Sequence, residues 1–193
     1  MRSGCAIRKI LTPKTRYNTR MSDLQIRDAN PKDAVGIATV HVRTWQCAYK
    51  GQISQAYLDS LSVEQRRITW EQALSEPDPG VHVIVATLGE KVVGWSTYGT
   101  SRDEDATQET GELHGIYVDP DYIGKGIGSA LMEAAVAGLK KDGYIKTTLW
   151  VLDTNEKTRK FYEKMGWVEQ GMQKDDPRDG FTLHEIRYVR DIL

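Results

Sequence analysis

The sequence predicts a single α/β domain of the α+β type, in which one mixed, mostly antiparallel central sheet is flanked by helices. The 193 residues suit one domain, and 39% of them are hydrophobic and 27% charged, as in ordinary soluble globular proteins. β-Rich runs and amphipathic helical runs alternate in the order β, α, α, β, β, β, α, β, α, β, β. A chain of this length buries enough surface to fold without metals or disulfides.

The first half of the chain is predicted to contain two helices between strands. In order, we expect a strand over 24–27, helices over 34–49 and 55–75, and strands over 82–88 and 91–98. Pro31 suits the first turn of a helix, where its missing N–H is not needed, and Gly51 ends that helix. Pro77 stops the second helix. Gly89-Glu90 joins the last two strands as a hairpin turn.

The second half begins with a polar loop. In order, we expect this loop over 99–111, a strand over 113–118, a helix over 127–139, a strand over 145–152, a helix over 155–164, and strands over 167–172 and 181–190. Asp119-Pro120 ends the first of these strands. Ile127, Leu131 and Leu139 lie on one face of the following helix, which predicts that this face is buried.

The charge of the chain is unevenly distributed. The 26 Lys and Arg residues almost balance the 27 Asp and Glu residues, but six of the basic residues and none of the acidic ones lie in residues 1–20. The remainder, with 20 basic against 27 acidic residues, therefore has a net charge of −7. We expect residues 1–20 to be an extension without a fold of its own, upstream of a domain over 21–193. A targeting peptide and a nucleic-acid-binding arm are the alternatives.

Composition also excludes several classes of protein. No apolar run approaches the ~20 residues that cross a bilayer, so we expect no membrane span. Cys5 and Cys47 offer neither metal-ligand spacing nor a disulfide framework, so we expect no metal site and a reducing, cytoplasmic location. We expect a small-molecule partner rather than nucleic acid. The oligomeric state stays open, with a homodimer as one option.

A glycine-rich run separates the strand over 113–118 from the next helix. It consists of Gly124, Lys125, Gly126, Ile127, Gly128 and Ser129. At such a turn the backbone N–H groups and the positive end of the helix dipole converge, and glycine lets an anion approach the main chain. The spacing fits neither a Walker loop nor a Rossmann fingerprint. The run predicts an anion site of another kind, with a plain loop-to-helix turn as the alternative.

A second motif follows one strand later. Asn155 and Tyr162 are seven residues apart, so they share a helix face. If that helix packs beside the anion site, the amide and the phenol point towards the part of the ligand that is attached to the phosphates. The alternative is that Asn155 caps the helix, while Tyr162 packs in the core with its neighbour Phe161.

Together, the two motifs resemble the GNAT superfamily of N-acetyltransferases. The pyrophosphate loop of that family reads Arg/Gln-x-x-Gly-x-Gly/Ala. Gly126 and Gly128 match its two small positions, while Ile123 stands at the first position. Asn155 and Tyr162 match a later Asn and Tyr of the family. Two motifs in the right order and spacing are far more specific than either one alone.

The resemblance implies a GNAT-like fold with acetyl-CoA as co-substrate and no metal. The pyrophosphate lies on the glycine-rich run, with Asn155 also in the cofactor site. Pantetheine adds like an extra strand along Ile116, Tyr117 and Val118, and a backbone N–H of that strand polarises the thioester carbonyl. Tyr162 donates a proton to the departing thiolate. No side-chain nucleophile is needed, because the amine attacks acetyl-CoA directly.

The acceptor amine must lose a proton before it attacks. A lysine-like amine has a pKa of about 10.4, so at pH 7 only roughly one molecule in 2500 is neutral. We expect Glu112, at the entrance of the strand over 113–118, to be the base, since its spacing from the loop resembles that of the family's glutamate. His114 is the second candidate, because it shares the same side of a regular strand. The alternative for Glu112 is a solvated residue without a catalytic role.

The predicted function is transfer of acetyl from acetyl-CoA to an amine, with a small cationic amine as acceptor. Family resemblance brings His41, Trp45 and Tyr49 of the first helix to the acceptor site, where aromatic faces can hold an ammonium group. The alternative places Trp45 and Tyr49 in the core. Two rival functions are protein N-terminal or lysine acetylation, and non-catalytic binding of acyl-CoA.

Overall fold

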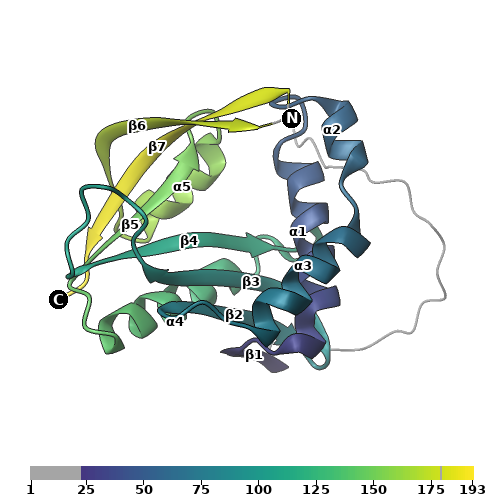
Figure 1. Ribbon diagram of the computed structural model, residues 1–193, viewed down its shortest axis with the longest axis horizontal. Helices are drawn as coiled ribbons and strands as arrows, with labels where there is room; N and C mark the ends of the chain where they lie inside the picture. Colours follow the sequence, from purple (N-terminus) through teal and green to yellow (C-terminus); the bar gives the residue numbers. More distant parts are fainter. Residues whose placement is uncertain (1–22, 179) are drawn as a thin grey trace.

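The computed structural model describes residues 23–178 and 180–193, so the expected extension over 1–20 lies outside the described residues (Figure 1). In chain order, the elements are β1 (Leu24–Asp28), η2 (Pro31–Asp33), α1 (Ala34–Ala48), α2 (Gln55–Ser60), α3 (Val63–Ser75), β2 (Val81–Leu88), β3 (Lys91–Thr100), β4 (Thr110–Val118), η3 (Pro120–Tyr122), α4 (Ile127–Lys141), β5 (Lys146–Leu152), α5 (Glu156–Lys164), β6 (Val168–Arg178) and β7 (Phe181–Asp191).

The described residues form one seven-stranded sheet in the order β1-β2-β3-β4-β5-β7-β6. The β4–β5 pair is parallel and the other neighbours are antiparallel, which confirms the predicted mixed, mostly antiparallel sheet. Helices cover both faces. Residues of α1 and α3 pack on one face of the sheet, against β2 and β3. Helices α4 and α5 pack on the opposite face, where the largest hydrophobic cluster lies (Figure 1).

The predicted long helix over 55–75 is wrong in one respect, because the structure has two helices there. Leu61 ends α2 with an extended backbone, and Ser62 begins α3 by accepting a hydrogen bond from the N–H of Gln65 at 3.3 Å. Helical periodicity alone does not distinguish a serine that caps a new helix from one more polar residue of a continuous helix.

The predicted loop over 99–111 is also shorter than expected, because β3 extends to Thr100 and β4 begins at Thr110. Gly111 belongs to β4, although glycine is depleted in strands. A Cβ atom at this position would lie 2.6 Å from Cδ2 of Leu139, so the approach of α4 requires a glycine here. Glu112 is therefore the third residue of β4 and not a residue at its entrance.

Candidate active site between β4 and β5

The two central strands of the sheet are paired only at one end. β4 and β5 pair over three residues each, Thr110–Glu112 with Lys146–Thr148. Beyond them β4 continues to Val118 and β5 to Leu152, and Figure 1 shows the two strands diverging. No strand in the described part of the chain pairs with this side of residues 113–118. The main chain of Ile116, Tyr117 and Val118 therefore faces an opening in the sheet.

A bulge in β4 changes which side chains face this opening. Thr97 of β3 pairs with Gly115, but the next residue, Tyr98, pairs with Leu113, so His114 is the extra residue. The period-of-two relation between Glu112 and His114 is thereby broken. Even so, Nε2 of His114 lies 4.0 Å from Oε2 of Glu112, so the two candidate bases remain neighbours.

The ring of Tyr117 lies over Gly115 of the same strand, next to the bulge. A Cβ atom on Gly115 would lie 2.9 Å from Cε2 and 3.7 Å from the hydroxyl of Tyr117, so the ring occupies the space that a side chain at 115 would take. The ring stacks on Trp95 at 4.4 Å and on His41 at 5.3 Å between centroids. Burial raises the pKa of the Tyr117 phenol, which therefore stays protonated at neutral pH.

The glycine-rich run forms the turn that begins α4. Gly126 is the residue before the helix, with φ +84°, and Gly124 has φ +82°. Both are left-handed conformations that favour glycine, and a Cβ atom at either position would have no atom within 4 Å. The turn before α4 therefore has open space beside Gly124 and Gly126, as an anion site at a helix N-terminus requires.

Two lysines lie beside this turn. Nζ of Lys125 lies 4.6 Å, and Nζ of Lys91 4.7 Å, from the centroid of the Tyr122 ring. Lys91 comes from the start of β3, and sequence reasoning missed it because no motif links it to the loop. Together with the helix dipole, the two cations favour a phosphorylated ligand.

Helix α1 is tied to the same end of β4. The hydroxyl of Thr44 donates to the carbonyl of Val118 at 3.2 Å, and Arg43 forms ion pairs with Asp119 at 3.2 Å and Asp121 at 2.9 Å. Asp119 is buried and also accepts the N–H of Asp121. These contacts hold α1 against the exit of β4, where the glycine-rich turn begins.

Asn155 and Tyr162 lie at the start and in the last turn of α5. Asn155 caps the helix, since its side chain accepts the N–H of Thr158 at 3.3 Å. Its structural role is confirmed, and its contact with a cofactor stays a prediction. Tyr162 is 5% exposed and packs with Trp167 and Tyr188. Burial raises its pKa far above the ordinary value, so the phenol keeps its proton.

The predicted base Glu112 is enclosed. Its side chain is 2% exposed. Oε2 accepts from the backbone N–H of Arg102 at 2.8 Å and from Nε at 3.2 Å, while Nη2 of Arg102 donates to Oε1. Nε2 of His114 contacts the carbonyl of Thr100 at 3.0 Å, and burial lowers the pKa of this imidazole, so it is neutral at pH 7. Glu112 is thus not a solvated residue, and both of its oxygens already accept hydrogen bonds from Arg102.

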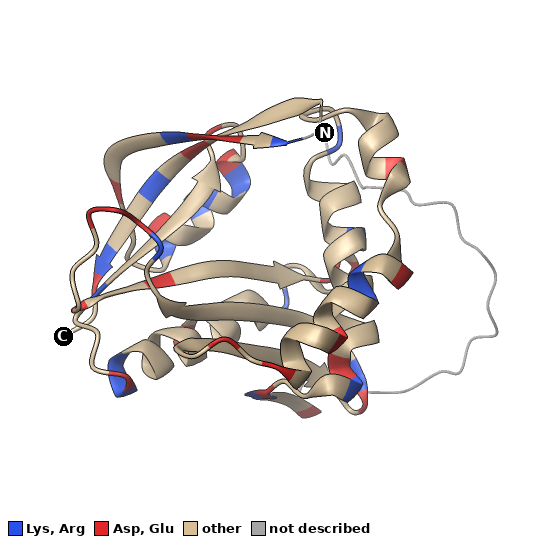
Figure 2. Cartoon of the chain, viewed as in Figure 1, with Lys and Arg blue, Asp and Glu red and all other residues tan. Residues whose placement is uncertain are grey.

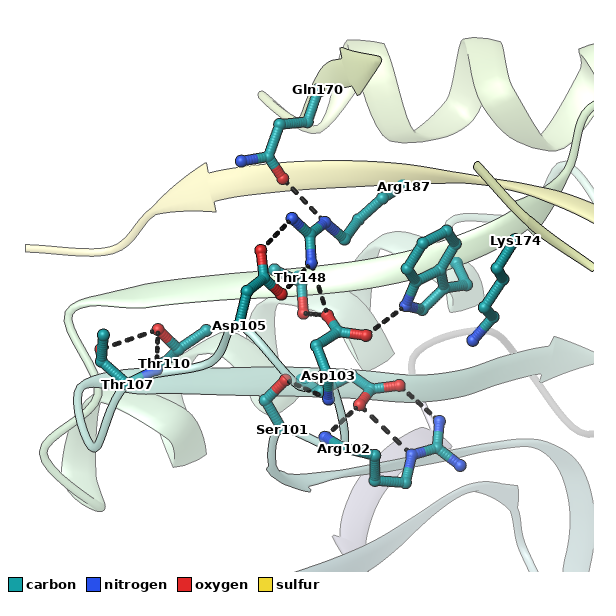
Figure 3. A network of polar contacts seen from close by, with 12 residues as sticks. Ser101, Arg102, Asp103, Asp105, Thr107, Thr110, Thr148, Gln170, Lys174 and Arg187 are labelled. Carbon is teal, nitrogen blue, oxygen red and sulfur yellow. Dashed lines mark hydrogen bonds and ion pairs between the residues drawn. The ribbon is translucent and has the colours of Figure 1, made fainter. Parts of the chain in front are cut away.

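The loop that carries Arg102 is held by a buried ionic network (Figure 3). Asp103 accepts hydrogen bonds from the Thr148 hydroxyl at 3.0 Å and from Nε1 of Trp150 at 2.7 Å, and it pairs with Arg187 at 3.2 Å. Arg187 is 4% exposed and also donates twice to Asp105, at 2.6 Å each. Figure 2 shows this acidic loop beside the β6–β7 hairpin, which carries several basic residues.

The three aromatic residues proposed for the acceptor site belong to two neighbouring clusters, joined by a contact of 5.8 Å between the ring centroids of His41 and Trp45. Trp45 packs in the α1–α2 face with Leu152 and Leu183, and the Tyr49 ring lies 4.8 Å from it. This confirms the alternative in which they pack in the core. The His41 ring stacks instead on Tyr117, and burial, aided by the charge of Arg66, lowers its pKa to about 4. A role of these residues in acceptor binding stays a prediction.

One partly buried carboxylate was missed by the sequence analysis. Glu185 in β7 is 19% exposed, and burial raises its pKa. Its charge also contributes to raising the pKa of Tyr49, Tyr117 and Tyr162. Leu152 and Leu183, its neighbours in the sheet, pack in one cluster with Tyr49 and Tyr117, so Glu185 lies on the α1 side of the opening between β4 and β5. No short motif marks Glu185, because its partners come from distant parts of the chain.

The described residues contain no group of three or more His, Cys, Asp or Glu side chains that could hold a metal ion. None of the helices formed by residues 23–178 and 180–193 is long and apolar enough to cross a membrane.

The Acetyltransferase (GNAT) family profile matches residues 34–167. The uncharacterized N-acetyltransferase YuaI of Bacillus subtilis is 31% identical over 130 residues, 67% of this chain and 72% of the relative. A probable N-acetyltransferase of Mycobacterium tuberculosis, Rv2775, is 25% identical over 86% of this chain and 93% of its own length. The chain therefore belongs to the GNAT family of acetyltransferases.

Solved structures share the fold at lower identity. The PaiA N-acetyltransferase of Thermoplasma acidophilum, in complex with coenzyme A, superposes with a TM-score of 0.64 at 21% identity, covering 87% of this chain and 98% of that one. A putative acetyltransferase of Salmonella typhimurium, yncA, with its cofactor acetyl-CoA, gives 0.63 at 18% identity, covering 89% and 95%. These neighbours confirm the predicted fold.

Asp103→Asn is expected to destabilise the protein by about 1 to 3 kcal/mol, because it removes the charge that faces buried Arg187 and weakens a shared hydrogen-bond network. Urea unfolding followed by tryptophan fluorescence measures the change. Glu104→Gln is the matched control, since it removes the same charge from an exposed residue of the same loop. Equal stability of the two variants would contradict the structural role of the network.

Proposed function

We propose that this protein transfers the acetyl group of acetyl-CoA to the amine of a small cationic acceptor. The observation that carries the proposal is the unpaired edge of β4 directly before the glycine-rich turn of α4. The strand edge then binds the pantetheine part of one long ligand, and the helix N-terminus binds its pyrophosphate. The structural neighbours that contain coenzyme A or acetyl-CoA have the same fold, which supports this choice of co-substrate.

The residues of the site fit acetyl-CoA. The run from Gly124 to Ser129 offers backbone N–H groups to the pyrophosphate, and the open space around Gly126 leaves room for it. Lys91 and Lys125 lie close by for the remaining phosphate charge. The edge of β4 at 116–118 offers backbone groups to the pantetheine amides, in the manner of an added strand. Asn155, at the start of α5, lines the same side.

The chemistry proposed for the site is direct attack of the amine on the thioester. A backbone N–H of β4 stabilises the oxyanion, for which a single donor contributes roughly 3 to 4 kcal/mol in acyl-transfer enzymes. Tyr162 donates its phenolic proton to the thiolate as the C–S bond breaks. Its raised pKa keeps that proton in place through neutral pH. A purely acyl-CoA-binding protein would use Tyr162 for packing only and would show no turnover.

Two observations favour a cationic acceptor. The net charge of residues 21–193 is −7, which attracts cations over long range. Glu185 adds a negative charge inside the site. Acetylation of a protein N-terminus or lysine remains the alternative, since a lysine side chain offers the same ammonium group.

Gly126→Val is expected to reduce the affinity for coenzyme A by at least roughly tenfold, because the branched side chain fills the space left for the pyrophosphate. Calorimetric titration measures the affinity. Gly143→Val is the matched control, since Gly143 follows the other end of α4 with φ +91° and an equally open surrounding. The cofactor assignment fails if the wild type shows no heat with coenzyme A, or if both variants bind as it does.

Tyr162→Phe is expected to lower kcat by about 10-fold to 1000-fold while affinity for coenzyme A and the fold are kept, because only the proton donor is lost. Tyr188→Phe is the control, since that buried phenol contacts Arg159 at 3.3 Å and Glu163 at 3.0 Å instead. An unchanged kcat in Tyr162→Phe, measured by release of free thiol, would leave the residue a packing role only.

Spermidine is expected to be acetylated with a higher kcat/KM than aniline, whose amine is neutral at pH 7, and than a lysine-containing peptide. The reason is the attraction between the negative protein and a small polycation. The free-thiol assay compares the three amines on the full chain and on a chain that starts at Met21. Preference for aniline would contradict the charge argument, and preference for the peptide would favour a protein acceptor.

A further inference from the structure

Glu185 lies on the face of the sheet that α1 and α2 cover. Its neighbours across the strands are Leu152 in β5 and Lys174 in β6. Side chains alternate along a strand, so Glu185 shares a face with Leu183. Leu183 packs with residues of α1 and α2. The carboxylate is thus on the α1 side of the opening, opposite to the face that α4 covers.

The carboxylate of Glu185 has fewer hydrogen-bond and ionic partners than that of Glu112. Its ionic partner among the described residues is Lys174, whose Nζ lies 3.6 Å from Oε2 and whose side chain is 40% exposed. Nζ of Lys174 also lies 4.2 Å from the centroid of the Trp150 ring. Glu112, in contrast, is enclosed by Arg102 on both oxygens. A ligand cation can therefore reach Glu185, whose side chain is 19% exposed, by displacing Lys174, whereas the side chain of Glu112 is only 2% exposed.

Glu185 adjoins the aromatic cluster on the α1 side of the opening, because its neighbours Leu152 and Leu183 pack there with Tyr49 and Tyr117. Its field reaches the phenols of Tyr49, Tyr117 and Tyr162, which come from three different elements. It also reaches Arg102 on the loop after β3. Glu185 therefore lies on the α1 side of the opening, next to the cluster that contains Tyr49 and Tyr117, and its charge acts on Tyr162 from there.

We propose that Glu185 binds the ammonium group of the acceptor and takes its proton. This inference rests on the proposed function. The neutral nitrogen then attacks the thioester carbon, the C–N bond forms, and the C–S bond breaks as Tyr162 gives its proton to sulfur. The phenolate recovers a proton from the new amide nitrogen. Glu185 releases the first proton to water, so one proton is released for each acetyl group transferred.

The charged and titratable groups around Glu185 determine the pH dependence. From β6, Lys174 and Arg178 lower its pKa and Asp176 raises it, while burial raises it most. Arg102 and the three phenols face it from the other elements. The active form is the carboxylate, so activity falls as the pH drops through this raised pKa. At high pH, more of the acceptor is already neutral and the carboxylate matters less.

The test compares Glu185→Gln with the wild type, using spermidine and the lysine-containing peptide as ammonium acceptors. We expect kcat/KM at pH 7 to fall by about 100-fold, with a defect that shrinks as the pH rises. Affinity for coenzyme A is expected to stay unchanged. Glu185→Asp should recover part of the activity. Acetylation of aniline, which carries no ammonium proton at pH 7, should change little.

Lys174→Ala is the matched control, because it removes the same ion pair from the other side. If the pair serves only the fold, the two variants lose activity alike, and the inference is wrong. If Glu185→Gln keeps the wild-type kcat/KM and pH profile, the inference is also wrong, while the proposed function stands. If the wild type acetylates none of the three amines, the proposed function fails and this inference with it.

Discussion

The geometry of the site depends on the early end of strand pairing between β4 and β5. After three residue pairs, β5 continues beside β7, while β4 continues beside β3 alone. The sheet is therefore continuous at one end and open at the other. Unpaired backbone groups in the middle of a sheet are costly unless water or a ligand satisfies them. The unpaired edge of β4 therefore suits the proposed pairing with the amide groups of pantetheine.

Groups on opposite faces of the sheet meet through this opening. Tyr162 packs in the cluster on the α4 side, and Tyr117 stacks with Trp95 on the α1 side, yet Tyr117 contributes to raising the pKa of Tyr162. A fully paired β4 and β5 would separate these faces with backbone. The bulge at His114 and the missing side chain at Gly115 leave the space that the Tyr117 ring fills.

At the end of the sheet where β4 and β5 pair, ion pairs stabilise the structure in addition to strand pairing. Arg187, from β7, is buried against Asp103 and Asp105 of the loop after β3. Burying such charges is costly, and removing one partner leaves the other unpaired, so the network holds the loop in one position. That position places Arg102 on Glu112. The same network therefore keeps Glu112 enclosed, while Glu185 on β7 is 19% exposed.

Local features of the site could be predicted from the sequence, while its long-range contacts could not. The glycine-rich turn at Gly126 and the cap at Asn155 depend on neighbours within a few residues, so their residue types indicate them. The enclosure of Glu112 depends on Arg102 across a loop, and the position of Glu185 depends on groups in four elements. The bulge at His114 likewise follows from pairing with β3, which periodicity cannot reveal.

The central claim is that the edge of β4 and the turn before α4 bind acetyl-CoA together. Amide hydrogen exchange with and without coenzyme A, followed residue by residue, tests it most directly. The account predicts that residues 113–118 and 124–129 exchange readily in the free protein and become protected together when coenzyme A is bound, while β2 and β7 change little. Binding of coenzyme A with protection elsewhere, or with no protection of β4, would contradict it.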